Sequence, residues 1–490
     1  MKRFALATLS LFACGLIAEP AVGQEVAFFQ DAAPNQPTPV TDTLDARLQA
    51  LEVEAQNLKP TLEEHSQRIT KIEDGIKADK EKAAAAKAAD AKKDKKWYEK
   101  LSIRGYTQVR INEVFDDNDS PADPHYVGDS SIGENQSFIL RRMRVIIFGD
   151  INEHVYVYLQ PDFAASLPSV SGTTSDANQF AQLRDAYADL YIDKEKEFRF
   201  RVGQSKIPYG WENLQSSQNR LPLDRNDALN SAARNERDLG VFFYYTPKDV
   251  QDLFKEISDK GLKGSGNYGM FALGAYNGQG GSFREQNDNL HVISRFALPF
   301  YVGDEQIVEV GIQGYIGKYT VLSSLIDPPG PVGLSRPTGT LETDGRDGIH
   351  DKRLAWTFVY YPQPFGFQSE WTIGRGPSLN DAQTEVIDRS LYGGYAMVMY
   401  RMEFEDNEEI IPFARWNYYK GGYKSERNAP YSEIKEWEMG VEWQINKAVE
   451  FVTMYTITDR TNTAAISRDN TRSYEQFEGG ILRFQLQFNY

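Results

Sequence analysis

The last nine residues of the chain, Leu482-Arg483-Phe484-Gln485-Leu486-Gln487-Phe488-Asn489-Tyr490, alternate apolar and polar side chains without a break. Successive side chains of a β-strand point to opposite faces, so one face is apolar and aromatic while the other carries arginine, glutamine and asparagine. Such a strand fits a soluble sandwich with one wet face, and it fits a transmembrane barrel with lipid outside and water inside. The segment predicts a strand and leaves both architectures open.

The same two-residue period extends from Trp97 to the end of the chain, where aromatic residues and glycine replace alanine and lysine. We count about sixteen alternating segments, the even number that outer-membrane barrels use. They lie at 102–113, 137–150, 152–163, 185–193, 197–206, 239–246, 267–277, 289–298, 306–319, 352–361, 365–375, 391–402, 409–419, 435–445, 448–458 and 478–490.

The connections between these segments alternate in length. Long connections lie at 114–136, 164–184, 207–238 and 320–351, and short ones at 150–151, 194–196 and 446–447. A barrel with both termini in the periplasm requires short periplasmic turns and long external loops. The connection 247–266 is an exception, because it is long where a short turn is expected.

Aromatic residues support the membrane interpretation. The chain ends on Tyr490, like the carboxyl-terminal assembly signal of outer-membrane barrels, and Tyr360-Tyr361 and Tyr418-Tyr419 fit the aromatic girdles at membrane interfaces. We predict an all-β fold, a 16-stranded antiparallel transmembrane β-barrel over residues 97–490, placed in the bacterial outer membrane. A soluble β-domain is the alternative.

Composition excludes several other classes. The 490 residues include 54 Lys and Arg against 70 Asp and Glu, for a net charge of -16, and the mean hydropathy is -0.53. After the amino terminus no apolar run is long enough for a membrane-spanning helix. We expect no nucleic-acid partner, because phosphate binding needs a net basic face.

The amino terminus predicts export. Lys2 and Arg3 precede an apolar run that ends in small residues, so residues 1–23 are expected to be a signal peptide cleaved before Gln24. Cys14, the single cysteine, lies in the removed segment, although the same position admits a lipoprotein box as an alternative. A mature chain without cysteine needs no disulfides.

Two helical segments should follow a Pro-rich linker at 24–43. Apolar residues at 44–76 are spaced alternately four and three apart, which predicts an α-helical coiled coil; one amphipathic helix packed on a globular domain is the alternative. His65 stands on this seam, where a polar residue fixes register, and Pro60 indicates a kink or a helix restarted in phase. Residues 77–96 form a Lys/Ala-rich helical spacer, and binding of this region to peptidoglycan is a second interpretation.

Several motifs beyond Trp97 point to one family. The strongest is the segment Gly203-Gln204-Ser205-Lys206-Ile207-Pro208-Tyr209-Gly210-Trp211-Glu212, followed by an arginine-rich stretch. Upstream lie Arg141-Arg142-Met143-Arg144 and Leu183-Arg184-Asp185-Ala186-Tyr187. Together these motifs resemble the phosphate-selective porin O and P family of Gram-negative outer membranes. The resemblance implies a homotrimeric porin with a constricting loop, for which a three-stranded coiled coil would suit the symmetry.

Strand parity identifies most of the side chains that should face the lumen; Lys206 comes from the family motif, and Arg225 is one of the bases of the loop 207–238, together with Arg220, Arg234 and Arg237. The candidate pore-lining and anion-binding residues are Arg104, Arg110, Arg142, Arg144, Arg199, Arg201, Lys206, Arg225, Arg415 and Arg483. Facing them should be Glu370, Glu436, Glu438, Glu442 and Glu450. One interpretation is an arginine track for small anions such as phosphate. The other is an unselective general porin whose charges form a transverse field or latch the loop by ion pairs.

We therefore expect an outer-membrane porin for passive diffusion of small hydrophilic solutes, in contact with outer-membrane lipid and with its amino-terminal region in the periplasm. An enzyme is not expected, because the five histidines are scattered and none has a metal-ligand spacing or a neighbouring nucleophile motif; no cofactor is expected either. A structural tether, with the barrel as its anchor and the helical segments reaching the cell wall, is the alternative.

Overall fold

The computed structural model describes residues 96–116, 138–164, 181–281, 283–326, 333–343, 347–405, 408–463 and 474–490, together with isolated residues at 126–136, residue 331 and scattered positions between 48 and 82. The chain divides into two compact units, residues 1–94 and 95–490. In the first unit, the described residues are helical and exposed. The signal peptide and linker lie outside the described residues, and the coiled coil and spacer remain predictions.

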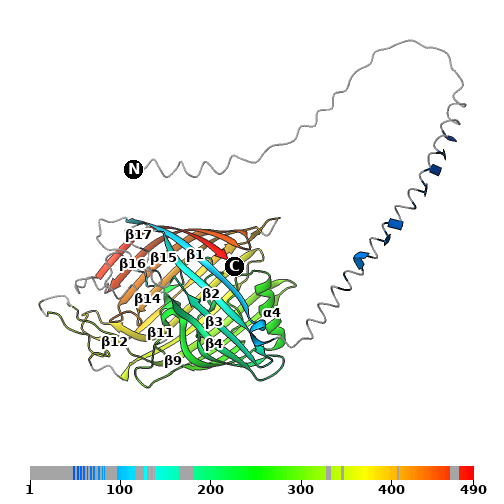
Figure 1. Cartoon of the computed structure of the whole chain (residues 1–490). Coiled ribbons are helices and arrows are strands. Elements are labelled where there is room, and N and C mark those ends of the chain that lie inside the picture. Colours follow the sequence, from blue (N-terminus) through cyan, green and yellow to red (C-terminus); the bar gives the residue numbers. More distant parts are fainter. Residues whose placement is uncertain are drawn as a thin grey trace, which may run out of the picture. The chain divides into compact units, whose positions relative to one another are not determined.

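The second unit is a closed antiparallel barrel (Figure 1). Its strands are β1 (Ser102–Asp116), β2 (Ile139–Asn152), β3 (Val155–Asp162), β4 (Gln182–Tyr191), β5 (Phe198–Lys206), β6 (Arg237–Tyr245), β7 (Phe271–Tyr276), β8 (His291–Val302), β9 (Gln306–Tyr319), β10 (Ile349–Tyr360), β11 (Phe365–Leu379), β12 (Val386–Tyr400), β13 (Met402–Glu403), β14 (Glu409–Gly422), β15 (Tyr431–Asn446), β16 (Val449–Thr463) and β17 (Tyr474–Asn489). Each strand pairs with its sequence neighbours, and β17 closes the ring on β1 from Tyr106↔Asn489 to Asp116↔Gly479.

The predicted number of spanning strands is confirmed. The structure has seventeen strands, but β13 has only two residues and pairs with β14 on the same side as β12 does. Sixteen long strands therefore form the wall of the described barrel. All backbone polar groups of a membrane-spanning wall must pair within the protein, and a closed sheet achieves this without an edge.

Burial follows the predicted alternation. Along β10, Leu354, Trp356 and Phe358 point outward and are each at least 40% exposed, while Asp351 and Arg353 point inward and are buried. Apolar side chains outside and charged ones inside are the arrangement of an outer-membrane barrel and exclude a soluble domain with a dry core. None of the described helices is long and apolar enough to cross a membrane.

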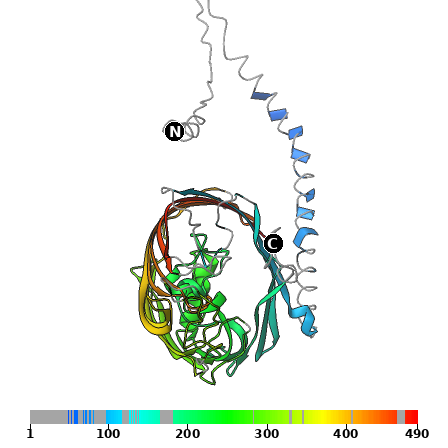
Figure 2. The ribbon, with the colours of Figure 1, turned by 90° about the vertical axis from the view of Figure 1, so that its left-hand side faces the viewer.

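The two rims of the barrel differ. One rim, which we name the short-turn end, carries the connections β2–β3, β8–β9, β10–β11 and β15–β16. The start of β1, which follows η1 (Trp97–Lys100), and the terminal Tyr490 lie at the same rim. The opposite rim, the long-loop end, carries the longer connections. The connection between β5 and β6, residues 207–236, contains α2 (Trp211–Leu214), α3 (Asp227–Asn230) and η3 (Arg234–Glu236). Figure 2 shows green segments inside the ring of strands, and the residues of α2 are buried there.

The long connection after β6 has a structural explanation. It contains α4 (Lys248–Asp259), whose Val250, Leu253, Phe254 and Ile257 are buried. These side chains pack with Trp211, Ile307, Val359 and Tyr361 in one apolar cluster. Strand β7 accordingly begins at Phe271, not at 267 as the alternation predicted, because the preceding residues belong to this inserted segment.

Phe254→Ala should loosen α4 from the barrel. Truncating a buried Phe removes contacts worth about 3 to 5 kcal/mol, and a 12-residue helix is only marginally stable without packing. We expect limited trypsin digestion to cut faster at Lys255 and Lys260 than in the parent protein. Asp252→Ala, on the exposed side of the same helix, is the control; equal cleavage of both variants would contradict the packing role.

Candidate functional site: a constricted channel

Residues 207–236 form a constriction loop that enters the barrel and attaches to its interior. Trp211, Tyr209, Leu229 and Ala228 are fully buried, although they lie in a connection between two strands. Most loops of proteins run over the surface, because buried backbone needs partners for its polar groups. Many partners of this loop come from the inner wall at β9–β16, and others come from β1, β5 and β17.

Glu370 of β11 provides the main attachment. Its two carboxylate oxygens accept the backbone N–H groups of Trp211, at 2.6 Å, and of Glu212, at 3.1 Å. These are the first N–H groups of α2, which have no partner within the helix. Gln313 and Thr357 also donate to Glu370, so the carboxylate is surrounded by donors from three elements.

Arg353 of β10 holds the second part of the loop. Its guanidinium donates to the hydroxyl of Ser231 at 2.8 Å and to the carbonyls of Ala228 at 3.1 Å and of Ser231 at 3.0 Å. These acceptors belong to α3 and its C-terminal flank, whose carbonyls lack partners within the helix.

Ion pairs complete the attachment. Arg415 of β14 pairs with Glu212 and Glu438, and Arg460 of β16 pairs with Asp227 and with Glu436 at 2.9 Å. The inward glutamates expected from strand parity are buried, and most of them bind wall arginines, a lysine or backbone N–H groups of the loop. Glu442, for example, pairs with Lys263.

The loop leaves space toward the opposite wall, β1–β5, where two cavities lie. The long-loop cavity has a volume of about 310 Å³ and is lined on both sides by arginine. The short-turn cavity has a volume of about 540 Å³ and lies between β1–β5, the constriction loop and the segment after α4. Arg144 of β2 lines both cavities. At this position it donates to Tyr106 at 2.7 Å and to Ser217 of the loop at 3.1 Å, so loop and wall are in direct contact here.

Arginine dominates the lining of the long-loop cavity. Seven arginines contribute to it: Arg141, Arg142, Arg144, Arg184, Arg220, Arg225 and Arg234. Four of the lining residues are acidic: Asp162, Asp224, Glu236 and Glu426. Burial alone would raise the pKa of the Glu236 carboxyl, but Arg225, Arg184 and Arg237 outweigh it and hold the pKa well below its usual range. Glu236 is therefore ionised and neutralises part of this cluster.

Arg142 and Arg220 differ from the other arginines of this cluster because each is buried and lacks a carboxylate partner; Arg234, which also lacks one among the described residues, is only half-buried and lies over the ring of Phe283. Among the described residues neither Arg142 nor Arg220 has a carboxylate within ion-pair distance; Arg142 donates to Gln108 at 2.8 Å, and Arg220 donates to the carbonyls of Pro222 and Leu223. The Nε of Arg142 and the Nη1 of Arg220 are buried without a hydrogen-bond partner. Burial and then the neighbouring Arg225 lower the pKa of Arg220 to about 9, so it still carries its charge at neutral pH. Both positive charges remain available to an anion.

Two β-bulges bring additional arginines inward. The register of β1 with β2 shifts from Gln108↔Arg142 to Val109↔Leu140, which leaves Arg141 as the extra residue. The register of β3 with β4 shifts from Gln160↔Asp185 to Pro161↔Leu183, which leaves Arg184 extra. A bulge changes the direction of the side chain of the inserted residue. Two adjacent residues therefore reach the lumen on β2, Arg141 and Arg142, and on β4, Arg184 and Asp185.

Six of the ten residues predicted from the sequence line the two cavities. Arg104, Arg144, Arg201 and Lys206 line the short-turn cavity, and Arg142, Arg144 and Arg225 line the long-loop cavity. The other four predicted residues face inward but do not line either cavity. Arg110 and Arg483 pair with Asp129 and Asp224, Arg415 attaches the loop, and Arg199 donates to the carbonyl of Asn267 at 2.6 Å.

Strand parity missed several cations of the channel. Arg141 and Arg184 were missed because bulges shift their parity. Arg220 and Arg234 lie in the loop, where parity does not apply, and Arg237 is the first residue of β6. Lys263 follows α4, in a connection that was expected to be short. Among the residues that the structure describes, no group of three His, Cys, Asp or Glu is placed to hold a metal ion.

The sequence of residues 122–490 matches the family described as phosphate-selective porin O and P. The chain belongs to this family. The sixteen-stranded barrel, with its inward constriction loop, is accordingly the barrel of an outer-membrane porin, and the family and the fold point to a channel. No curated protein matches the chain.

Several solved porin structures are similar to the chain at low identity. OmpF of Salmonella typhi, in complex with daunomycin, is 12% identical and covers 80% of this chain and 97% of its own, with a TM-score of 0.47. A trimer form of OmpT of Vibrio cholerae is 10% identical, covers 80% and 99%, and has a TM-score of 0.45. An anion-selective porin from Comamonas acidovorans is 9% identical, covers 80% and 99%, and has a TM-score of 0.42.

Glu370→Ala should release the constriction loop. Two buried N–H groups would lose their acceptor, at about 1 to 3 kcal/mol each, so α2 should leave the wall and move within the lumen. We expect a noisier and altered single-channel conductance in planar bilayers. Glu433→Ala, which removes a partly exposed glutamate paired with Lys420, should behave like the parent; an unchanged conductance in Glu370→Ala would show that the loop is held elsewhere.

Proposed function

We propose that this porin lets small hydrophilic anions, phosphate among them, diffuse through the two cavities that meet at Arg144. The observation that carries the proposal is the pair of buried cations at the long-loop cavity, Arg142 and Arg220, which have no carboxylate partner among the described residues. A buried charge without a counterion is costly. An anion that enters the cavity relieves this cost, whereas a cation adds to it.

The series of cations along the β1–β5 wall supports passage beyond this entry point. From the long-loop cavity the lining continues through Arg144 to Lys206, Arg237, Arg201 and Arg104 at the short-turn cavity. Selectivity of a water-filled barrel depends on the charges that line the path, not on the net charge of the chain. Partial neutralisation, as by Glu236 and Asp185, keeps anion binding weak enough for release.

Orientation and assembly follow from the porin architecture. We infer that the short-turn end faces the periplasm, that the amino-terminal region is also periplasmic, and that the long-loop end faces outward. We also infer a homotrimer, as the family resemblance and the predicted coiled coil suggest. A role as a tether to peptidoglycan through residues 24–96 is compatible with a channel and does not replace it.

Replacing both Arg142 and Arg220 by Gln should reduce anion preference. A unit charge ~8 Å from a passing anion contributes about 2 kcal/mol at an effective dielectric constant of ~20, so the anion over cation permeability ratio should fall several-fold. The measurement is the reversal potential across a KCl gradient in planar bilayers, with and without added phosphate. Arg375→Gln, an exposed arginine paired with Asp388, is the control.

An unchanged reversal potential in the double variant would contradict the anion proposal and favour a general porin. A weakly selective current in the parent protein that phosphate leaves unaffected would do the same.

Deletion of residues 24–96 should separate channel from tether. The barrel unit has its own closed sheet, so the shortened protein should assemble and conduct like the full chain. Loss of a tether should appear in cells as blebbing of the outer membrane. A shortened protein that assembles but does not conduct would contradict a purely diffusive role for the barrel.

A further inference from the structure

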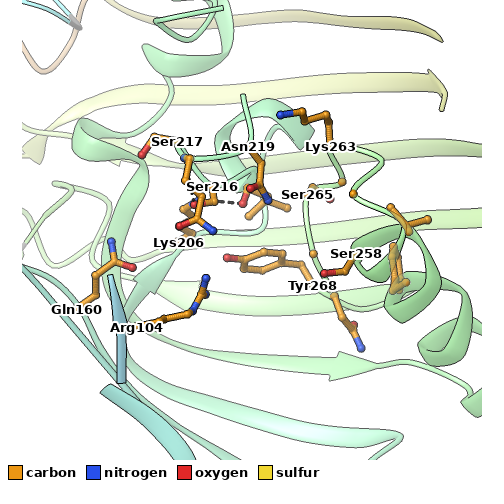
Figure 3. A pocket seen from close by; sticks show the side chains of 18 of the residues that line it. Arg104, Gln160, Lys206, Ser216, Ser217, Asn219, Ser258, Lys263, Ser265 and Tyr268 are labelled. Atoms are coloured by element: carbon orange, nitrogen blue, oxygen red, sulfur yellow. Dashed lines mark hydrogen bonds between the residues drawn. The ribbon is translucent and has the colours of Figure 1, made fainter. Parts of the chain in front are cut away.

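The short-turn cavity has a composition unlike that of the long-loop cavity. Tyr158, Tyr187, Tyr268 and Tyr361 line it together with serine, asparagine and glutamine side chains. Its volume of about 540 Å³ lies in the range of sites that hold organic ligands, and it is much larger than a bare phosphate needs. Figure 3 shows Arg104 from the wall, Ser217 and Asn219 from the constriction loop, and Lys263, Ser265 and Tyr268 from the segment after α4 around this space.

The inserted connection after β6 builds one side of this chamber. Gln215 of the constriction loop donates to the carbonyl of Lys263 at 2.6 Å, and the apolar face of α4 packs on Trp211. The constriction loop, the segment after α4 and the β1–β5 wall therefore all line the chamber. A connection of ordinary length would leave this part of the lumen open.

Several polar side chains around the chamber have unused hydrogen-bonding capacity. Ser265 is 95% buried, and its hydroxyl has no partner. Within the described part of the chain, the hydroxyl of Tyr268 and the side-chain amide of Asn219 also make no hydrogen bond. Buried polar atoms are normally satisfied, so the buried hydroxyl of Ser265 is suited to a ligand, and the half-buried Tyr268 and Asn219 offer further groups to a ligand that carries several hydroxyls.

A cation and aromatic rings complete the chamber. Among the described residues, Arg104 has no acidic partner; its guanidinium lies 5.5 Å from the ring centroid of Phe148. Tyr158 and Tyr187 stack at 5.1 Å between centroids, and Arg201 lies 3.8 Å from the centroid of Tyr187. Stacked rings fixed by a cation form a rigid, partly apolar surface, against which the C–H face of a sugar ring can pack.

We propose that this chamber is a binding subsite for phosphorylated sugars, with the phosphate at Arg104 and the sugar hydroxyls at Asn219, Ser265 and Tyr268. The proposal rests on the anion passage proposed above and adds the class of organic anion. The long-loop cavity attracts the anionic group, and the chamber distinguishes a phosphate that carries a polyol from inorganic phosphate.

This subsite is tested in the full-length protein in planar bilayers. The measurement is the block of the ion current by glucose 6-phosphate, by inorganic phosphate and by glucose. Two or three added hydrogen bonds predict half-block by glucose 6-phosphate at a concentration about tenfold lower than by inorganic phosphate. Glucose should block more weakly than glucose 6-phosphate. Equal half-block concentrations for the two phosphates would overturn the subsite while leaving anion passage intact, whereas an unselective current that neither phosphate blocks would overturn both proposals.

Tyr268→Ala should raise the half-block concentration for glucose 6-phosphate more than that for inorganic phosphate. Asn219→Leu is a second variant, on the other side of the chamber, for use if the first does not assemble. Tyr400→Ala, an exposed tyrosine at the short-turn end that does not line the chamber, is the matched control. Equal effects of Tyr268→Ala and Asn219→Leu on both phosphates would also overturn the subsite.

Discussion

The buried carboxylate of Glu370 determines where the channel runs. It accepts the first backbone N–H groups of α2, and with Arg353 it attaches the constriction loop to the β9–β16 side of the barrel. Because these polar groups are buried, any other position of the loop leaves several of them unpaired at a cost of kilocalories each. The loop therefore has one position, and the passage lies along the opposite wall, where the strands carry arginine.

The acidic character of the whole chain and the basic character of the passage are consistent with one another. Several carboxylates inside the barrel form ion pairs at the attachment of the loop: Glu212 and Glu438 bind Arg415, and Asp227 binds Arg460. Their charges are cancelled at the positions where the loop is held, so they contribute little to the field along the path. The charges of the cations on the β1–β5 wall are neutralised less completely by carboxylates. The local excess of positive charge therefore follows from the unequal distribution of ion pairs and not from the composition of the chain.

Strand parity predicted the barrel well because a two-residue period is repeated along every strand and lipid contact enforces it. The number of spanning strands and the inward direction of Arg110, Arg415 and Arg483 followed from it. Parity could not reveal which inward arginines are neutralised, since their partners lie in loops remote in the sequence. It also failed at the bulges at Arg141 and Arg184, where one inserted residue reverses the alternation. The constriction loop was predicted from the family resemblance, because the periodicity of the sequence does not predict a loop that enters the barrel.

The segment after β6 shows how an insertion at a barrel rim acquires a role in the channel. A helix as short as α4 gains its stability from packing, and its partners are Trp211 of the constriction loop and Val359 and Tyr361 of the wall. The same contacts that stabilise the helix place Lys263, Ser265 and Tyr268 beside the passage. Loop and insertion are joined directly through Gln215, so displacement of either changes the shape of the chamber between them. On the proposed path a solute contacts both the loop and the insertion, so a substitution in either element changes the proposed subsite.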